Sequence, residues 1–144
     1  MSKILFREAR HDDLDNIWRM ICELENYELN RSTFSKLFSS NIENSNVFYL
    51  VAEDENVVIG FASLHIQQLL HHNGKVGEIQ ELYINNNKRG KGYGGLILDT
   101  LKGIAHEKGC ILLEVSCNVK RKKTHSFYEK EGMVKSHYKF TYKL

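Results

Sequence analysis

The chain of 144 residues has no proline, no low-complexity run and no internal repeat, so it contains no visible linker. Its three cysteines, Cys22, Cys110 and Cys117, are an odd number without a C-x-x-C pair. This argues against a disulfide scaffold and against a zinc knuckle, and it fits a reducing compartment. We therefore expect a single domain over residues 1–144 in a cytoplasmic protein.

Long hydrophobic stretches and an excess of one charge are also missing. No window approaches the length of a membrane span, and the N-terminal segment MSKILFREAR has too short an apolar run for a signal peptide. There are 20 basic and 18 acidic residues, and the net charge of +2 is too small to indicate a nucleic-acid-binding protein. We expect neither a membrane nor a nucleic acid as a partner.

Apolar periodicity and turn residues divide the chain into strands and helices. Helices are expected over 14–24, 31–43 and 124–131 and from the glycine loop to Gly109, with Asp12 as the cap of the first. Strands are expected over 4–9, 47–52, 57–70, 76–84, 111–116 and 134–144. The apolar strand 111–116 should be buried, and a hairpin should turn at 53–56. The strand–helix–strand order around 76–116 implies one parallel pair in a mixed sheet.

The segment from Gly77 to Gly95, GEIQELYINNNKRGKGYGG, runs from an alternating strand through a polar turn into a glycine-rich loop that opens a helix. Within it, residues 89–94 have the form R-x-x-G-x-G, in which glycines let a phosphate approach the main chain. The first turn of a helix has unpaired N–H donors and a partial positive charge, which favour an anion. Taken alone, the loop also fits a surface turn with solvated cations.

The arrangement of strand, loop and helix is followed some thirty residues later by a helix with Phe127–Tyr128 that ends in Glu131–Gly132–Met133. This order resembles the GNAT superfamily of acetyl-CoA-dependent N-acetyltransferases, and the resemblance extends from Arg7–Glu8–Ala9 to the last expected strand. It implies a GNAT-like α/β fold with a central mixed, mostly antiparallel sheet of about six to seven strands and about four flanking helices. The sheet should be splayed at the strand before the pyrophosphate loop.

Longer segments resemble the aminoalkylphosphonate N-acetyltransferases within that superfamily. They are ICELE at 21–25, LHIQQLLHH at 64–72, GEIQEL at 77–82, SCNVKRKKTHSFYEKEGM at 116–133 and SHYKFT at 136–141. The turn Asn85–Asn87 departs from the superfamily because it lacks the proline often found there. The distance of ten residues from Asn118 to Tyr128 (128 − 118) is longer than in many relatives, but the narrower group shares it.

The resemblance places acetyl-CoA on the glycine loop and on the strand before it. The pyrophosphate would lie on the loop, the pantetheine would pair with the strand backbone, and a bulge near Leu82 would free an N–H for the thioester carbonyl. Such a donor stabilises an oxyanion by about 2.7–4 kcal/mol. The implied cofactor-binding residues are Leu82, Tyr83, Ile84, Arg89, Gly90, Lys91, Gly92, Tyr93, Gly94, Gly95 and Asn118.

Two catalytic side chains are implied, Glu78 and Tyr128. Tyr128 matches the family tyrosine that protonates the departing thiolate, with aromatic packing as the alternative role. Glu78 lies four residues before Leu82, where histone-acetyltransferase-like relatives place their base. Strand alternation puts Glu78 on the face of Leu82, whereas Glu81, the second candidate, should point the other way unless a bulge intervenes. Both carboxylates could instead be solvated strand residues.

A phosphonate on the acceptor would need cationic or polar donors. The candidate substrate-binding residues are Tyr27, His71, His72, Lys120 and Arg121. A solvated charge is the alternative for each basic residue. The histidines, with His65 and Glu78, could also hold a divalent metal, but their spacing matches no zinc signature, and no metal ligand is assigned.

The sequence therefore predicts an enzyme that moves acetyl from acetyl-CoA to a primary amine by direct attack in a ternary complex. The favoured acceptor is a small aminoalkylphosphonate or a related phosphorylated amine. The alternatives are another small amine, an amino sugar phosphate or a peptide N-terminus, or else a non-catalytic acyl-CoA-binding module, against which the presence of Tyr128 counts. Analogy with such enzymes also suggests a homodimer.

Overall fold

The computed structural model describes residues 3–144. The chain separates into two compact units, one up to Glu114 and one from Val115 onward, and each is described by itself. The first unit holds nearly all of the sheet and three long helices, and the second holds the last helix and the C-terminal tail. Within residues 3–144, no helix is long and apolar enough to cross a membrane.

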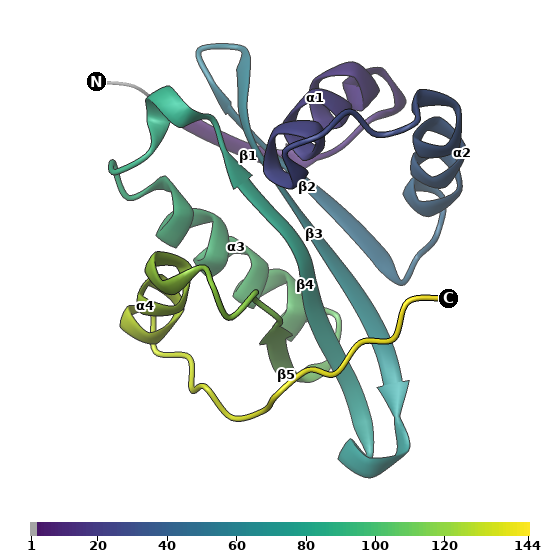
Figure 1. Cartoon of the computed structure of the whole chain (residues 1–144), viewed down its shortest axis with the longest axis vertical. Helices are drawn as coiled ribbons and strands as arrows, with labels where there is room; N and C mark the ends of the chain where they lie inside the picture. Colours follow the sequence, from purple (N-terminus) through teal and green to yellow (C-terminus); the bar gives the residue numbers. More distant parts are fainter. Residues whose placement is uncertain (1–2) are drawn as a thin grey trace. The chain divides into compact units, whose positions relative to one another are not determined.

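The strands and helices follow the expected order up to the last helix (Figure 1). The strands are β1 (Ile4–Glu8), β2 (Val47–Asp54), β3 (Val57–Leu69), β4 (Gly74–Ile84) and β5 (Cys110–Val115). The helices are α1 (Leu14–Glu25), α2 (Arg31–Ile42), α3 (Tyr93–Glu107) and α4 (Lys122–Lys130). Three short 3-10 turns join them, η1 (His11–Asp13), η2 (Leu70–His72) and η3 (Asn86–Lys88).

One sheet contains the strands in the order β1-β2-β3-β4-β5. The first four pair antiparallel with their neighbours in chain order. Strand β5 is the neighbour of β4, and the Cβ positions of Gly74 and Gly77 on β4 fall close to side chains of β5. The mixed, mostly antiparallel sheet is confirmed, but residues 3–144 contain five strands rather than six to seven.

The missing strand is the one expected over 134–144, where the structure has neither helix nor strand. The alternating side chains of Val134, Tyr138, Phe140 and Tyr142 are 84–92% exposed. Alternation assigns side chains to two faces, but a strand also needs a partner for its main-chain groups. That pairing is not encoded in the local pattern, which is why this prediction was wrong.

Strand β5 also differs from the expected buried strand. It lies at one end of the strand order, and its Ile111 and Leu112 are 63% and 41% exposed. A continuous apolar run is typical of a strand covered on both faces, but it cannot distinguish a central from an edge position. The hairpin between β2 and β3 turns at Glu55 and Asn56, inside the expected range, with φ values of 49° and 67°. Two central residues of positive φ define the type I′ turn, which matches the twist of its strands.

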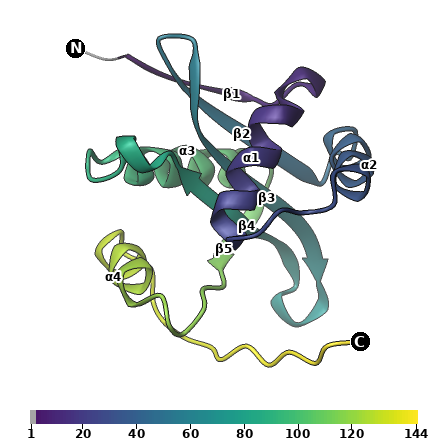
Figure 2. The ribbon, with the colours of Figure 1, turned by 45° about the horizontal axis from the view of Figure 1, so that its top comes forward.

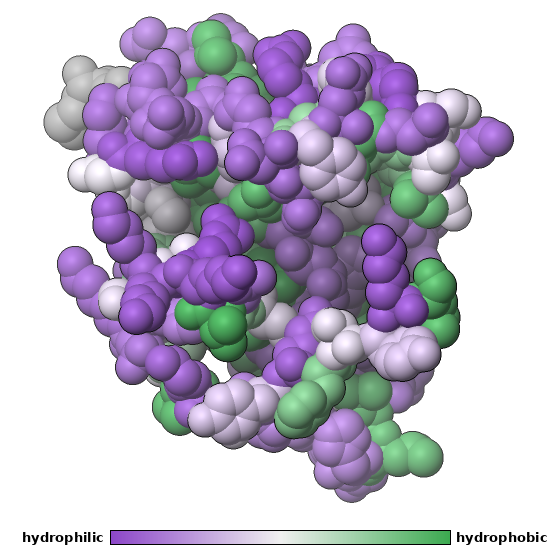
Figure 3. All heavy atoms as spheres, in the orientation of Figure 1, coloured by the Kyte–Doolittle hydropathy of each residue, from purple (hydrophilic) through white to green (hydrophobic). Residues whose placement is uncertain are grey.

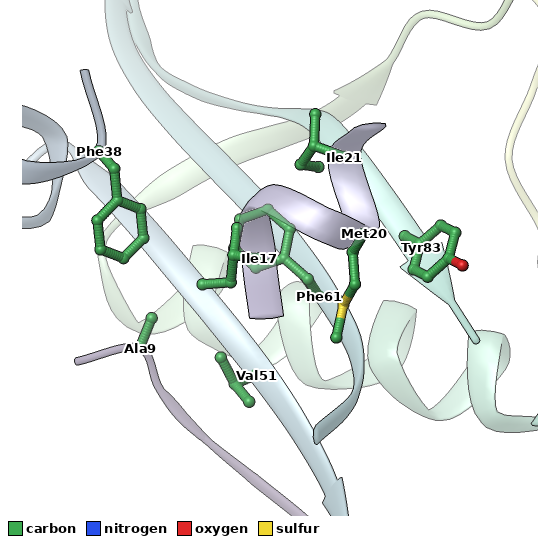
Figure 4. Close-up of a cluster of buried hydrophobic side chains, with 8 residues drawn as sticks. All are labelled: Ala9, Ile17, Met20, Ile21, Phe38, Val51, Phe61 and Tyr83. Carbon is green, nitrogen blue, oxygen red and sulfur yellow. The ribbon is translucent and has the colours of Figure 1, made fainter. Parts of the chain in front are cut away.

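The helices of the first unit cover both faces of the sheet (Figure 1 and Figure 2). On the face covered by α1 and α2, a core forms around Ile17, Phe38, Val51 and Phe61 (Figure 4). On the other face, α3 buries an apolar stripe that includes Ile97, which approaches Gly60. The outer surface over α1 and α2 is mainly hydrophilic, as expected for amphipathic helices (Figure 3).

The entry into α1 is fixed by a buried carboxylate. Asp13 accepts two hydrogen bonds of 2.8 Å from the Arg7 guanidinium and one of 2.7 Å from the backbone N–H of Arg10. Arg7 also donates to Glu53, so β1 and β2 are joined at this point. Desolvation opposes ionisation of Asp13, but its hydrogen bonds with Arg7 and Arg10 prevail and hold its pKa below the ordinary value. Asp12, which was expected to cap this helix, is exposed, so that prediction was wrong and its neighbour Asp13 fixes the entry into the helix.

Candidate functional site

The antiparallel pairing of β3 and β4 is interrupted by a bulge at Gln80. Ser63 pairs with Glu81, but the next residue of β3, Leu64, pairs with Ile79, which leaves Gln80 as the extra residue. The backbone N–H of Glu81 turns to the Ser63 hydroxyl, at 3.0 Å. The expected bulge is therefore present two residues before Leu82, and it bends the strand where the acyl group was predicted to lie.

The bulge reverses the expected orientation of the two carboxylates. Without it, Glu78 would share the face of Leu82; with it, Glu78 and Glu81 both lie on the face covered by α1 and α2. The pairings show this, because Glu78 is opposite His65, and Glu81 is opposite Ser63 on that same face, whereas Leu82 pairs with Ala62 on the other. The prediction that Glu78 shares a face with Leu82 was wrong, since strict alternation ends at a bulge.

The two carboxylates have different partners. Ser63 donates a hydrogen bond from its hydroxyl to Glu81, and Ser63 is completely buried. Gln80 donates from its side-chain amide to Glu78. Glu81 also lines a cavity of about 360 Å³ between α1, α2 and the sheet, together with Gln80 and His65. Of the two carboxylates, Glu81 is thus the one that lines this cavity.

The glycine loop has the backbone geometry of an anion site. Gly90 and Gly92 have φ values of 77° and 84°, which side chains other than that of glycine rarely adopt. The first hydrogen bond of α3 runs from the N–H of Leu96 to the carbonyl of Gly92. The N–H groups of Tyr93, Gly94 and Gly95 therefore have no acceptor within the helix and are available to an anion.

Arg89 does not point freely out of this loop. Its Nε donates to the Ile84 carbonyl at 2.9 Å, Nη1 donates to Asn86 at 3.4 Å, and the guanidinium lies 5.3 Å from the centre of the Tyr83 ring. Main-chain bonds also fix the turn, because the N–H of Asn85 donates to the Ile59 carbonyl at 2.8 Å. Arg89 holds the loop against the end of β4, while Lys91 is exposed.

Lys88 ties the same turn to the β2–β3 hairpin. Its ammonium group lies 3.2 Å from Asp54 Oδ2, and Asp54 is buried. Among residues 3–144, Asp54 Oδ1 is the buried side-chain oxygen without a hydrogen-bond partner. Lys88 is therefore the charged group that compensates this carboxylate.

Tyr83 was expected to contribute through its main chain, but its side chain links two elements. Its ring belongs to the core, and its hydroxyl points away from that core and donates to Glu23 on α1 (Figure 4). Burial first and the hydrogen bond with Glu23 second raise the pKa of Tyr83 to about 12. A second cavity of about 470 Å³ lies beside this contact, and Asn85–Asn87 and the exposed Arg19 contribute to its walls.

The predicted substrate-binding residues of the first unit do not gather around the bulge. Tyr27 is exposed after α1, and the rings of His71 and His72 in η2 are tilted by 46° relative to each other, with centres 4.2 Å apart. Within residues 3–144, no three histidine, cysteine, aspartate or glutamate side chains converge on a point that could hold a metal ion. The metal site suggested for His65, the two η2 histidines and Glu78 is therefore not formed by these side chains.

The second unit contains the other predicted site residues. Burial, and to a lesser extent the neighbouring Cys117, raises the pKa of Tyr128 to about 12, although Arg121 opposes the shift. The Phe127 ring packs edge-on against Tyr128, with centres 5.1 Å apart. Burial also raises the pKa of the Cys117 thiol, which keeps it protonated and argues against a nucleophilic role.

Asn118 shapes the turn that leads into α4. Its Oδ1 accepts from the N–H of Lys120 at 2.9 Å, and its carbonyl accepts from the N–H of Arg121 at 3.0 Å and contacts the His125 ring at 2.8 Å. Lys120 and Arg121 are exposed. Asn118 thus has a defined structural role, and its expected contact with a cofactor stays a prediction.

Sequence analysis did not identify Ser63 or Glu23. Ser63 lies in an apolar stretch of β3 that gives no local sign of a site, and only the register of the sheet brings it to Glu81. Glu23 falls within ICELE, which was used as a signature but given no role. Identifying either contact requires the pairing of elements distant in sequence.

Comparison with known proteins assigns the architecture to a family. Residues 11–133 match the model of the acetyltransferase (GNAT) family. The chain is 39% identical over 135 residues to the aminoalkylphosphonate N-acetyltransferase of Salmonella typhimurium, covering 94% of this chain and 88% of the relative. It is 30% identical over 132 residues to glucosamine 6-phosphate N-acetyltransferase 1 of Dictyostelium discoideum, covering 88% and 82%.

A solved structure agrees at the level of the fold. The aminoglycoside N-acetyltransferase AAC(6')-Iy in complex with CoA superposes with a TM-score of 0.89, covering 100% of this chain and 96% of that one. The two sequences are 14% identical, so this likeness concerns the fold alone.

Proposed function

Because the chain belongs to the acetyltransferase (GNAT) family and is an acetyl-CoA-dependent N-acetyltransferase, we propose that its acceptor is a small aminoalkylphosphonate or a related phosphorylated amine. The observation that carries this proposal is the 39% identity to an aminoalkylphosphonate N-acetyltransferase over 94% of the chain. Glucosamine 6-phosphate, the acceptor in the name of other relatives, is likewise an amine that carries a phosphoryl group.

In this proposal the pyrophosphate of acetyl-CoA lies on the loop from Arg89 to Gly95. The positive φ values of Gly90 and Gly92 and the free N–H groups at the start of α3 support it, since both suit a close phosphate. The thioester then lies along β4 near Leu82, beyond the bulge at Gln80. Binding is tested by calorimetric titration of the protein with CoA. If no heat of binding is detected and CoA does not compete with acetyl-CoA for the protein, the proposal is contradicted.

Acetyl transfer on this scaffold proceeds by direct attack. The amine nitrogen forms a bond to the thioester carbonyl carbon, the carbon–sulfur bond breaks, a carboxylate takes the proton lost by the nitrogen, and the thiolate takes a proton from Tyr128. Because the bulge puts Glu78 and Glu81 on one face, either carboxylate is available on that side of β4. Glu81 is our preferred base, since it lines a cavity and Glu78 does not.

A matched panel of amines tests the acceptor. 2-Aminoethylphosphonate is compared with ethylamine, and glucosamine 6-phosphate with glucosamine, by the release of CoA thiol. We expect each phosphorylated compound to exceed its partner in kcat/KM, and the phosphonate to exceed the sugar phosphate. A preference for the sugar phosphate would favour the second candidate, whose support is the 30% identity to a glucosamine 6-phosphate acetyltransferase. Equal rates with and without the phosphoryl group would refute the assignment.

A further inference from the structure

We propose that the cavity between α1, α2 and the sheet holds an apolar arm of the acceptor, of benzyl or isobutyl size, on the carbon that bears the amine. This inference rests on the proposed acetyl transfer and adds a selectivity to it. Neither a small aminoalkylphosphonate nor an amino sugar phosphate has such an arm.

The cavity is large and mainly apolar. Its volume is about 360 Å³, and most of its wall consists of apolar side chains, among them Ile21, Phe34, Leu37 and Phe61. A cavity of about 150 Å³ lined by such residues is already large enough to hold benzene. A phenyl ring therefore fits here, and a methyl group leaves most of the space unfilled.

The charged groups of the lining favour an amine over an anion. Glu81 is its one carboxylate, and no lysine or arginine takes part in it. A phosphonate inside this space would lie next to a carboxylate of the same sign with neither lysine nor arginine to compensate it, and His65 is the one basic side chain of the lining, so this placement is unfavourable. An ammonium group beside Glu81 is favourable, so the cavity suits the amine and its hydrocarbon and excludes the anion.

Glu81 lies next in sequence to the proposed position of the thioester. It directly precedes Leu82, near which the thioester is proposed to lie, and the Ser63 hydroxyl holds its carboxylate. An amine at Glu81 is therefore close to the reacting carbon. A substituent on the adjacent carbon can extend along Ile21 and Phe61 while the phosphonate leaves in another direction.

The test compares two acceptors that differ in the arm alone, 1-amino-2-phenylethylphosphonate and 1-aminoethylphosphonate. One methylene in an apolar pocket is worth at least about tenfold in specificity. We expect kcat/KM for the benzyl compound to exceed that for the methyl compound by at least about tenfold. A ratio of one or below would overturn the proposal.

Two tryptophan variants locate the effect. Leu37 lies at the rim of the cavity and is exposed, so Leu37→Trp should fold and narrow the entrance. We expect it to reduce the benzyl-to-methyl ratio severalfold. Leu5→Trp, at an exposed leucine of β1 that does not line the cavity, is the matched control and should leave the ratio unchanged. Equal effects of both variants would show that the arm binds elsewhere.

A second measurement separates this proposal from the assignment of the acceptor. If neither phosphonate is acetylated, binding of 2-phenylethylamine and of ethylamine is measured by calorimetry on the wild type and on Leu37→Trp. Tighter binding of the phenyl compound that Leu37→Trp weakens would support the cavity even though the phosphonate assignment had failed. Equal binding of the two amines would refute the cavity proposal on its own.

Discussion

Tyr128 shows how the environment of a single residue limits the chemistry it can perform. Its pKa is raised to about 12 by burial and by the neighbouring Cys117, so it stays protonated at any physiological pH. If the CoA thiol resembles cysteine, with a pKa of ~8.5, full proton transfer from Tyr128 to the thiolate is uphill by roughly 5 kcal/mol. The proton must therefore move as the carbon–sulfur bond breaks, or the phenol must become more acidic when acetyl-CoA binds.

Replacing Tyr128 by phenylalanine tests this role. General acid catalysis contributes about 10²–10⁴-fold, so we expect kcat to fall within that range while the affinity for acetyl-CoA changes little. Steady-state kinetics and calorimetry on Tyr128→Phe measure the two quantities. Tyr138→Phe, in the exposed tail, is the matched control. Parallel losses of kcat and affinity would instead indicate a structural tyrosine.

The choice of base is also decided at single residues. We expect Glu81→Gln to lower kcat by about 10²-fold or more, since it removes the proton acceptor that lines the cavity. Glu78→Gln should have a smaller effect, because Glu78 contacts Gln80 and lies outside that lining. The two variants are compared in kcat at saturating acetyl-CoA and amine. A larger loss in Glu78→Gln would make Glu78 the base, as the sequence resemblance implied.

The sequence identified both candidate carboxylates but did not predict how they are oriented. Both Glu78 and Glu81 were identified as candidates, but the preference for Glu78 depended on the resemblance to histone-acetyltransferase-like relatives and on strict alternation along the strand. A bulge changes the face of every residue beyond it, and Gln80 has no sequence feature that marks it as the extra residue. The Ser63–Glu81 contact was equally hidden, because it depends on the register between two strands.

Among the elements, the turn between β4 and α3 is held from two sides. Arg89 fastens it to the end of β4, and Lys88 fastens it to Asp54 at the β2–β3 hairpin. Removing the charge of Asp54 should therefore disturb the loop that is proposed to hold the pyrophosphate. Because one oxygen of the buried Asp54 carboxylate has no hydrogen-bond partner, Lys88 is the main group that balances its negative charge. Removing that negative charge should therefore weaken the contact with Lys88.

For Asp54→Asn we expect a severalfold increase in KM for acetyl-CoA with little change in KM for the amine. A purely structural role would instead lower thermal stability and leave both KM values unchanged. Glu55→Gln, at an exposed carboxylate of the same hairpin, is the matched control and should alter neither. A rise in the KM for the amine alone would contradict the positioning role of Asp54.

Local sequence signals predicted where the helices and strands lie along the chain far better than which of them pair in the sheet. Helix periodicity located α1, α2 and α3 to within a few residues, because an amphipathic stripe is a property of the segment itself. The tail over 134–144 alternates just as clearly, yet it forms no strand in the described structure. The exposed edge position of β5 was missed for the same reason, since sheet order depends on interactions between segments.

For the whole molecule, two phenols with raised pKa values, the buried Tyr83 in one unit and the half-buried Tyr128 in the other, make stability depend on alkaline pH. The pKa values of Tyr83 and Tyr128 are both raised to about 12, mainly by burial, whereas an unfolded tyrosine titrates near ~10. Above pH ~10 the unfolded chain binds fewer protons than the folded one, so the free energy of unfolding falls as pH rises. These two groups therefore contribute their full stability below pH ~10 and lose it progressively as pH approaches ~12.

Urea unfolding at a series of pH values between 8 and 11.5 measures this slope. We expect stability to be nearly constant up to about pH 9.5 and to fall beyond it. In the double variant with Tyr83→Phe and Tyr128→Phe the fall should be shallower, because two groups that retain protons in the folded state are gone. Its stability at pH 8 should also be lower, since Glu23 loses its hydrogen bond from Tyr83. Tyr138→Phe serves as the control, and an unchanged slope in the double variant would show that these phenols are not the titrating groups.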